Sequence, residues 1–286
     1  MQKGVKFRIY PNREQQTIIN QTLGCCRLIY NKGLAMRNEA YQNGNKIGYS
    51  QTSAMLTDLK KSDGFAFLKA VDSIALQQSL RDLDRGFVNF FQKRASHPTF
   101  KSKHNHHQSY RTINQGDNIR IVGKYIKLPK LGFVKIRQTM GVEKINNITI
   151  ERTPTNKYFA VLNVKFEPQP MSNKGGKIGI DVGIKEFYSD SNGKVVYNPK
   201  YLEKSMRKLM REQRKLSRKE KGSTNRNKQR VKVALVHEKI TNQRNDFLQK
   251  QSTMLIRENQ TICIEDLKVK NMMRNHKLAQ HIGSAS

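Results

Sequence analysis

The first third of the chain is predicted to be helical, because its apolar residues recur every three or four positions. This spacing runs from about residue 13 to 42 and again over 50–61, where a polar cap precedes the apolar run. The segment 73–93 is the clearest amphipathic helix of the chain. We therefore expect a helical block over roughly 12–95.

Alternating apolar and polar positions replace this pattern farther along. Residues 5–11 alternate and end at a proline, and four more short alternating segments lie between 118 and 166. Regular short strands separated by turn residues predict a small barrel or curled sheet. The segment 167–176, with two prolines and two glycines, is expected to be a linker.

The remainder of the chain predicts a second mixed unit. Three short strands come first, then a long basic helical region with one break, and then another apolar strand. These segments are 177–182, 185–190, 194–197, 199–258 (broken at 221–227) and 261–266.

Charge narrows the class of partner. The chain carries 54 Lys and Arg against 22 Asp and Glu, a formal net charge of +32. A chain this basic repels itself unless a polyanion neutralises it, which points to nucleic acid. Residues 199–232 hold 14 cations and three glutamates, which is too one-sided for a merely solvated helix. A passive, histone-like basic protein remains the alternative on charge alone.

The cysteines and the hydropathy exclude other classes. The three cysteines form no CxxC pair, so we expect no zinc ribbon from these residues. So few cysteines suit a reducing cytosol. No run approaches the ~18 apolar residues that a membrane span needs, so no membrane partner is expected. Cys25 and Cys26 fall in a helical pattern and are predicted to be core residues.

Two carboxylates suggest chemistry. Asp181 lies inside an apolar strand, and Glu265 ends another strand some eighty residues later. A buried acid is costly unless it is paired or bound to a metal. The order of three strands, helices and a strand matches the front of an RNase H-like fold, in which such carboxylates hold divalent ions. The alternative is that Asp181 caps a turn and Glu265 pairs with a lysine.

Long motifs then make the chain similar to the TnpB family, transposon-encoded RNA-guided nucleases related to type V CRISPR effectors. The similarity covers essentially the whole chain. Motifs in the first half include "RIYPNREQQTIINQTLGCCRLIYN", "ALQQSLRDLDRGFVNFF", "FKSKHNHHQSYRT" and "LPKLGFVKIR". In the second half, "GIDVGIKEF" and "IEDLKVKNM" resemble the first two RuvC motifs, which puts Asp181 and Glu265 in metal-binding positions.

The resemblance implies a mixed α and β fold, in which a wedge-like β-barrel with an inserted helical recognition domain precedes a truncated RuvC-like α/β domain. The expected boundaries are 1–10 and 113–170 for the barrel, 11–112 for the helical insertion with its basic loop, 171–176 for the linker and 177–286 for the RuvC-like domain.

Family members continue into a zinc ribbon and a third RuvC motif, and this sequence contains neither. We therefore expect a vestigial site in which Mg²⁺ is not productively bound, because displacement chemistry depends on the placement of every ligand. The chain then resembles the nuclease-deficient TnpB-like transcriptional regulators, called TldR, which repress by occupying DNA. An active or fragmentary RNA-guided endonuclease is the alternative.

The resemblance also implies partners: a guide RNA derived from the transposon end, and double-stranded target DNA with a short flanking motif. A bacterial cytoplasmic, nucleoid-associated location is expected with them. The guide pairs with the target while the protein grips backbone and shape. Gln77 could read an adenine edge, although an exposed helix residue is the simpler interpretation of Gln77 taken alone. The residues expected to read the flanking motif are Tyr49, Ser53, Ser73, Ile74 and Gln77. Those expected to bind RNA are Lys101, Lys103, Tyr110, Arg111, Arg207, Arg211, Arg214 and Arg218. The nearby His104, His106 and His107 are attributed to a basic loop rather than to a metal site.

Overall fold

The structure is a computed structural model, and it describes residues 1–105, 108–142, 144–167, 175–275, 279 and 282. The chain forms two compact units, Met1–Pro168 and Gln169–Ser286, and each has its own sheet and helices. In the described part of the chain, no helix is both long and apolar enough to cross a bilayer.

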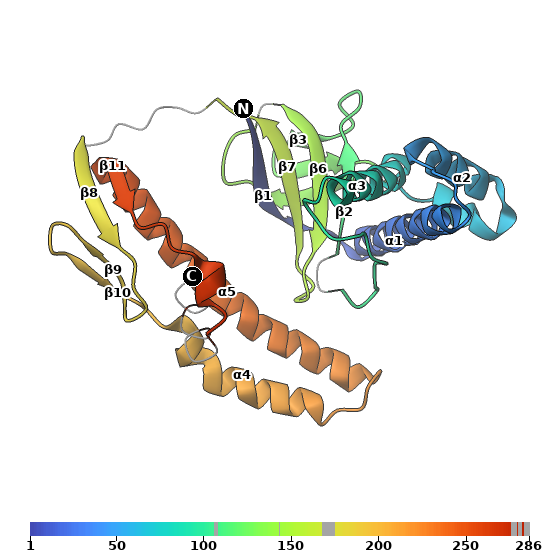
Figure 1. Cartoon of the computed structure of the whole chain (residues 1–286). Coiled ribbons are helices and arrows are strands. Elements are labelled where there is room, and N and C mark those ends of the chain that lie inside the picture. Colours follow the sequence, from blue (N-terminus) through green and yellow to red (C-terminus); the bar gives the residue numbers. More distant parts are fainter. Residues whose placement is uncertain (106–107, 143, 168–174, 276–278, 280–281, 283–286) are drawn as a thin grey trace. The chain divides into compact units, whose positions relative to one another are not determined.

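The first unit is built on a curled antiparallel sheet of seven strands in the order β2-β6-β7-β1-β5-β4-β3 (Figure 1). Side chains alternate across it, so that Val5, Phe7 and Ile9 of β1 are buried while their neighbours face outward. The strands are β1 (Gln2–Tyr10), β2 (Gln108–Ile113), β3 (Arg120–Val122), β4 (Tyr125–Leu128), β5 (Gly132–Arg137), β6 (Ile145–Arg152) and β7 (Tyr158–Lys165).

Helices follow β1 and pack against the sheet and against one another. The helices of this unit are α1 (Arg13–Gln42), α2 (Tyr49–Lys61), the 3-10 helix η1 (Asp63–Lys69) and α3 (Ser73–Phe91). A capping box between Asn12 and Gln15 begins α1, and the Asp72 carboxylate accepts a hydrogen bond from the Ile74 amide at the start of α3. Gly33 lets α1 approach α3 closely, since a Cβ there would lie 2.8 Å from a methyl carbon of Leu80. The predicted helices are thus confirmed.

The sheet begins earlier than the sequence indicated. Residues 108–112 were expected in the helical insertion, but β2 pairs with β6 from Gln108 to Ile113. Tyr110 and Thr112 are buried, whereas Ser109 and Arg111 lie on the other face. The alternation is short and polar, so only pairing with β6 reveals the strand.

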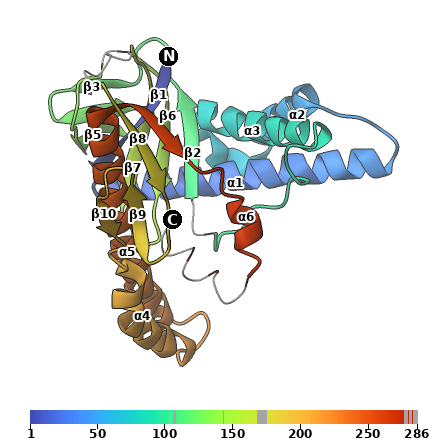
Figure 2. The ribbon, with the colours of Figure 1, turned by 60° about the vertical axis from the view of Figure 1, so that its left-hand side comes forward.

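The second unit contains a four-stranded sheet in the order β10-β9-β8-β11. Strands β8, β9 and β10 are antiparallel neighbours, and β11 lies beside β8 in parallel (Figure 2). A parallel neighbour needs a crossover, which α4 and α5 supply. The elements are β8 (Gly176–Asp181), β9 (Glu186–Asp190), β10 (Val195–Tyr197), α4 (Tyr201–Ser217), α5 (Thr224–Glu258), β11 (Asn259–Ile264) and α6 (Val269–Met272).

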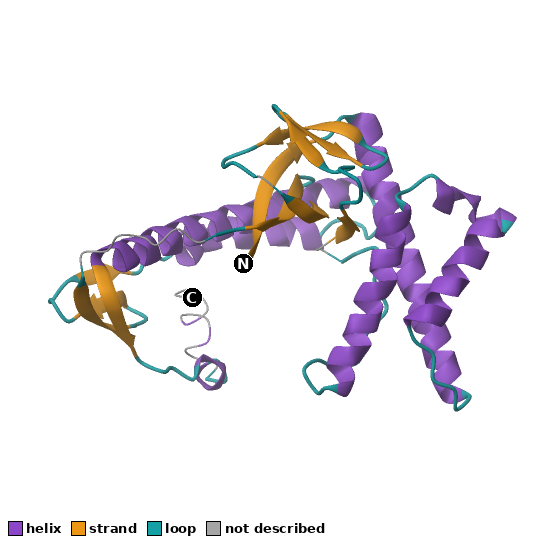
Figure 3. Ribbon diagram, turned by 90° about the horizontal axis from the view of Figure 1, so that it is seen from above, coloured by secondary structure: helices purple, strands orange, loops and turns teal. Residues whose placement is uncertain are grey.

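Helices α4 and α5 lie side by side as a hairpin (Figure 1), and Figure 3 distinguishes helices from strands by colour. Leu209 of α4 packs against Val236 and Ile240 of α5. The Arg226 guanidinium donates hydrogen bonds to the carbonyls of Leu216 and Lys219, at 2.7 and 2.8 Å, where the last carbonyls of α4 lack helical partners. This side chain therefore fixes the turn between the two helices.

Candidate functional site

The structure brings Asp181 and Glu265 to neighbouring strand ends. Ile180 of β8 pairs in register with Ile264, the last residue of β11, and each carboxylate is the next residue along the chain. Neighbouring strands lie about 4.8 Å apart, so the two backbones carry their acids side by side. Ile178 and Ile180 face the core, which places Asp181 on the opposite face of the sheet.

Both carboxylates are exposed. Within the described ranges, neither side chain forms a hydrogen bond or an ion pair, so neither a turn cap at Asp181 nor a lysine partner for Glu265 finds support. Carboxylate oxygens are the ligands that Mg²⁺ prefers, so the pair fits part of a divalent-cation site. Such an ion would supply activation of water for phosphodiester cleavage. The described residues contain no group of three or more His, Cys, Asp and Glu that could hold a metal.

Helix α4 presents a row of arginines along one side. These arginines follow one another at intervals of four, three and four residues, and this spacing aligns their side chains on one face of the helix. Leu209 and Glu212 are buried against α5 on the other side, so the row faces away from the hairpin core. The four exposed arginines are Arg207, Arg211, Arg214 and Arg218.

Helix α5 adds a second cationic row that the sequence analysis did not single out. Lys228, Lys232 and Lys239 are exposed and share one face by the same spacing rule. The helical spacing of these lysines already indicates the row in the sequence. A count of charges over the whole basic stretch does not resolve it.

The residues expected to read a DNA motif gather on two antiparallel helices. At one end, the Arg81 guanidinium of α3 lies 4.6 Å from the ring centre of Tyr49 on α2. At the other end, Lys60 of α2 donates a hydrogen bond to the Ser73 hydroxyl of α3, at 2.7 Å. The exposed Gln77 lies one helical turn from each of Ser73 and Arg81.

We call this surface the α2–α3 face. Its residues share one side of each helix, because 49, 53 and 60, and 73, 77 and 81, follow helical spacing. It consists of Tyr49, Ser53, Lys60, Ser73, Gln77 and Arg81, and the partly buried Ile74 adjoins it.

Lys60 and Arg81 are the members of the α2–α3 face that sequence reasoning missed. Burial lowers the pKa of Lys60, and the Asp72 carboxylate opposes that change. The ammonium group therefore has lost part of its water shell and is held at Ser73. A donor held there can reach a base edge or a phosphate.

The basic loop before β2 is tied to the helices. The Asn31 side chain donates to the Lys101 carbonyl and accepts from the Lys101 amide, at 3.0 and 2.8 Å. Although Lys101 is exposed as a whole, its ammonium nitrogen lies 4.0 Å from the ring centre of Tyr30, and burial lowers its pKa. Lys103 and His104 are exposed, whereas His106 and His107 lie outside the described residues.

Two residues expected to contact RNA have structural roles. Tyr110 is 7% exposed and belongs to the core of the first unit, where burial raises its pKa. Its ring is not accessible for base stacking in this position. Arg111 forms an ion pair with Asp82 of α3, so its charge helps to hold β2 against the helices. Cys25 and Cys26 are buried, as predicted.

Comparisons with known proteins place this geometry in a family. A family model described as "Probable transposase" matches residues 158–276, and one described as "Helix-turn-helix domain" matches residues 1–46. The structure of the latter range contains β1 and one uninterrupted helix, α1.

Two curated relatives cover most of the chain. A "Putative RNA-guided DNA endonuclease" of Streptomyces pristinaespiralis is 39% identical over 100% of this chain and 72% of its own length. The protein of Escherichia coli (strain K12) with the same description, InsQ, is 35% identical over 94% of this chain and 67% of its own length.

The fold is also similar to that of a solved complex. The protein chain in the cryo-EM structure of a Cas12f1–sgRNA–target DNA complex is 12% identical, with a TM-score of 0.54 over 100% of this chain and 86% of that chain. Taken with the identity to the curated relatives over two thirds or more of their length, these matches show that the chain belongs to the TnpB family.

Proposed function

We propose that this chain binds DNA under the direction of a guide RNA and represses transcription by occupying its target. The observation that carries guided binding is the arginine row of α4, in a chain of the TnpB family. Four guanidinium groups, each about one helical turn from the next, suit the repeated phosphates of a nucleic-acid backbone. Sequence would be read by the guide, which we propose derives from the transposon end.

The α2–α3 face is proposed to read the short duplex motif beside the target. Gln77 can pair bidentately with an adenine edge, and Lys60 can donate to a guanine. The Tyr49 ring contacts the Arg81 guanidinium and packs in part against the hydrophobic core, so the exposed part of the ring is what could contact a sugar or base. A bacterial protein with these partners would act at the nucleoid.

Occupancy without cleavage is proposed from the donor set. Asp181 and Glu265 are the carboxylates that the strand pairing brings together. Metal-dependent displacement depends on accurate placement of water and phosphate, and the described residues include no group of three or more His, Cys, Asp and Glu that could hold a metal.

RNA-guided endonuclease activity is the second candidate, and the same pair of carboxylates favours it. The register of β8 and β11 makes Asp181 and Glu265 neighbours, and such a pair would be able to share one divalent cation. The curated relatives carry that activity in their names.

One experiment separates the candidates. Purified protein with its co-purifying RNA is incubated with matched or mismatched target DNA and Mg²⁺, and binding and cleavage are scored in the same samples. Guide-dependent binding without cuts supports occupancy. Guide-dependent cuts that Asp181→Ala abolishes establish the endonuclease instead. Binding that ignores the guide sequence contradicts both and leaves a passive basic protein.

A further inference from the structure

The outward face of the curled sheet carries three exposed aromatic rings. Tyr10 of β1, Tyr125 of β4 and Phe133 of β5 are 46%, 48% and 51% exposed. Each lies on the face opposite the core, because its strand neighbours Ile9, Ile126 and Val134 are buried. Large exposed rings on one sheet face indicate a binding surface rather than ordinary surface composition.

Strand register interleaves these rings with cations. Lys135 of β5 pairs with Tyr125 on one side and with Tyr10 on the other. In the next row, Lys127 of β4 is the partner of Phe133. Because the Cβ atoms of cross-strand partners lie about 4.5–5.5 Å apart, each of these lysine side chains leaves the sheet next to an aromatic side chain.

A third row continues the pattern toward β7. Arg137 of β5 pairs with Arg8 of β1, and Arg8 pairs with Phe159 of β7. The Arg8 guanidinium lies 5.5 Å from the ring centre of Tyr10 and 5.1 Å from that of Phe159. These contacts hold the guanidinium against aromatic surface.

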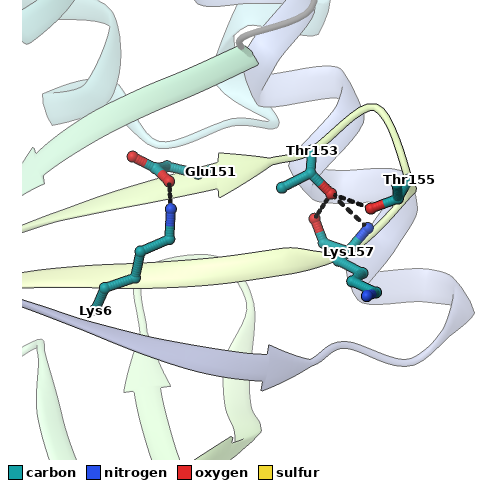
Figure 4. A network of polar contacts seen from close by, with 5 residues as sticks. All are labelled: Lys6, Glu151, Thr153, Thr155 and Lys157. Carbon is teal, nitrogen blue, oxygen red and sulfur yellow. Dashed lines mark hydrogen bonds and ion pairs between the residues drawn. The ribbon is translucent and has the colours of Figure 1, made fainter. Parts of the chain in front are cut away.

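The charge of this face has one sign. None of the strands β1, β3, β4, β5 and β7 contains an Asp or Glu. The nearest acid along these rows is Glu151 on β6, which pairs with Lys6 at 2.6 Å (Figure 4). That ion pair neutralises Lys6 and marks the edge of the positive region. In the turn that follows β6, the Thr153 hydroxyl forms hydrogen bonds with the Thr155 hydroxyl and with the backbone amide and carbonyl of Lys157.

We propose that this aromatic–basic face, made up of Arg8, Tyr10, Tyr125, Lys127, Phe133, Lys135 and Arg137, binds an unpaired segment of RNA by base stacking. Positive charge suits the phosphates, and exposed rings suit the faces of bases. Bases in a duplex are already stacked, so rings on a sheet recognise unpaired nucleotides. The inference rests on the proposed function, since the guide RNA is the RNA partner that it supplies.

Self-association through this face is disfavoured, because a second copy would bring the same cations together without acids to compensate. An uncharged partner held by stacking alone would not need the lysines between the rings. The combination therefore favours an anionic partner with flat apolar faces, which is the chemistry of a single-stranded nucleic acid.

The test uses the full chain with a short fluorescent RNA that has no secondary structure, and measures anisotropy over a series of salt concentrations. The double variant Tyr125→Ala, Phe133→Ala should bind about tenfold more weakly for each ring removed, with an unchanged salt slope. Tyr41→Ala, which removes a ring that is 76% exposed on α1, is the matched control. The single variant Tyr125→Phe should bind the RNA as tightly as wild type, because it keeps the ring.

Lys135→Gln is the complementary variant. It should lower the salt slope by about 0.7, the value for one neutralised phosphate on a single strand, while the rings stay in place. A blunt-ended RNA duplex should bind to wild type and to the ring variants with equal affinity. Circular dichroism of each variant verifies that the exposed substitutions leave the fold intact.

Three results would overturn the proposal: unchanged RNA affinity in the double variant, an equal loss of affinity for the RNA duplex, or tighter and equally ring-dependent binding of the same sequence as single-stranded DNA. A parallel assay of guide-dependent target binding by wild type distinguishes failure of the proposed function from failure of the role proposed for this face. If wild type ignores the guide, the proposed function fails whatever the rings do. If guided binding holds while the ring variants bind normally, this face alone loses its role.

Discussion

Ile180 and Ile264 are register partners on the parallel strands β8 and β11. The pairing spans more than eighty residues, and it makes Asp181 and Glu265 neighbours at one end of the sheet. Two exposed carboxylates on adjacent strands repel one another when no cation lies between them. The site is thus stabilised by whatever positive charge it binds.

This repulsion predicts that Asp181→Asn increases stability when divalent cations are chelated. The gain in the free energy of unfolding should be a few tenths to about 1 kcal/mol, as for other like-charged cross-strand pairs. Urea unfolding with EDTA measures it. Asp266→Asn, one residue beyond the pair, makes the same charge change as a control and should give less.

Adding Mg²⁺ should make wild type more stable than Asp181→Asn, because the cation binds the folded wild type through both carboxylates. A wild-type stability that does not respond to Mg²⁺ would show that the pair holds no cation under these conditions.

The arginine row of α4 should act through phosphates. Replacing Arg211 and Arg214 by glutamine should weaken RNA binding about equally for all sequences and lower the salt slope by about 1 for each arginine replaced. Filter binding over a range of salt concentrations measures both. The control is Lys250→Gln on α5, since Lys250 already pairs with Asp246 at 2.7 Å. Loss of affinity for some sequences only would contradict a backbone role.

The hydrogen bond between Lys60 and Ser73 predicts a role for Lys60 in choosing the flanking DNA motif. Lys60→Met keeps the stem but removes the donor, and Gln77→Ala removes a bidentate partner. Each should relax preference at its own motif position by about 1–3 kcal/mol. Selection of bound DNA from a library with a randomised flanking motif measures this preference. Lys61→Met, next in sequence, is the control, and an unchanged motif in both test variants would remove the α2–α3 face from DNA reading.

A buried acid should make the α4–α5 hairpin sensitive to pH. The Gln229 amide donates to the Glu212 carboxylate at 2.7 Å, and this hydrogen bond, with help from Lys215, lowers the pKa of Glu212. A depressed folded-state pKa adds stability above the ordinary pKa of about 4.3, and that stability is lost as pH falls through the folded value.

Glu212→Gln removes the titrating group and keeps an acceptor. The stability difference between wild type and this variant should be constant from about pH 7 to 5 and should shrink below about pH 4. Chemical unfolding at each pH follows it. A difference that stays independent of pH down to about 3 would contradict the coupling.

The double hydrogen bond between Asn31 and Lys101 should anchor the basic loop. Asn31→Ala removes both bonds at a cost of about 1 kcal/mol or more in local stability. Limited trypsin digestion should then cut faster at Lys101 and Lys103, while global unfolding changes little. Asn89→Ala on α3 serves as the comparison, and equal cutting of all three proteins would show that the loop is held elsewhere.

The sequence by itself determined most of the elements, because local periodicity indicates which residues form helices and strands. The helix predicted over 13–42 is α1, and the break predicted at 221–227 lies at 218–223, between α4 and α5. It also determined the polyanionic class of partner, which depends only on composition, and motif spacing indicated the family.

Tertiary structure decided which residues meet. Local pattern says nothing about which strand lies next to which, so the neighbours Asp181 and Glu265, the place of β2 and the burial of Tyr110 all followed from long-range pairing. The contact of Lys60 with Ser73 depends likewise on two helices packing antiparallel. Interactions between distant segments are set by how apolar faces are buried together, and this is a property of the whole folded chain.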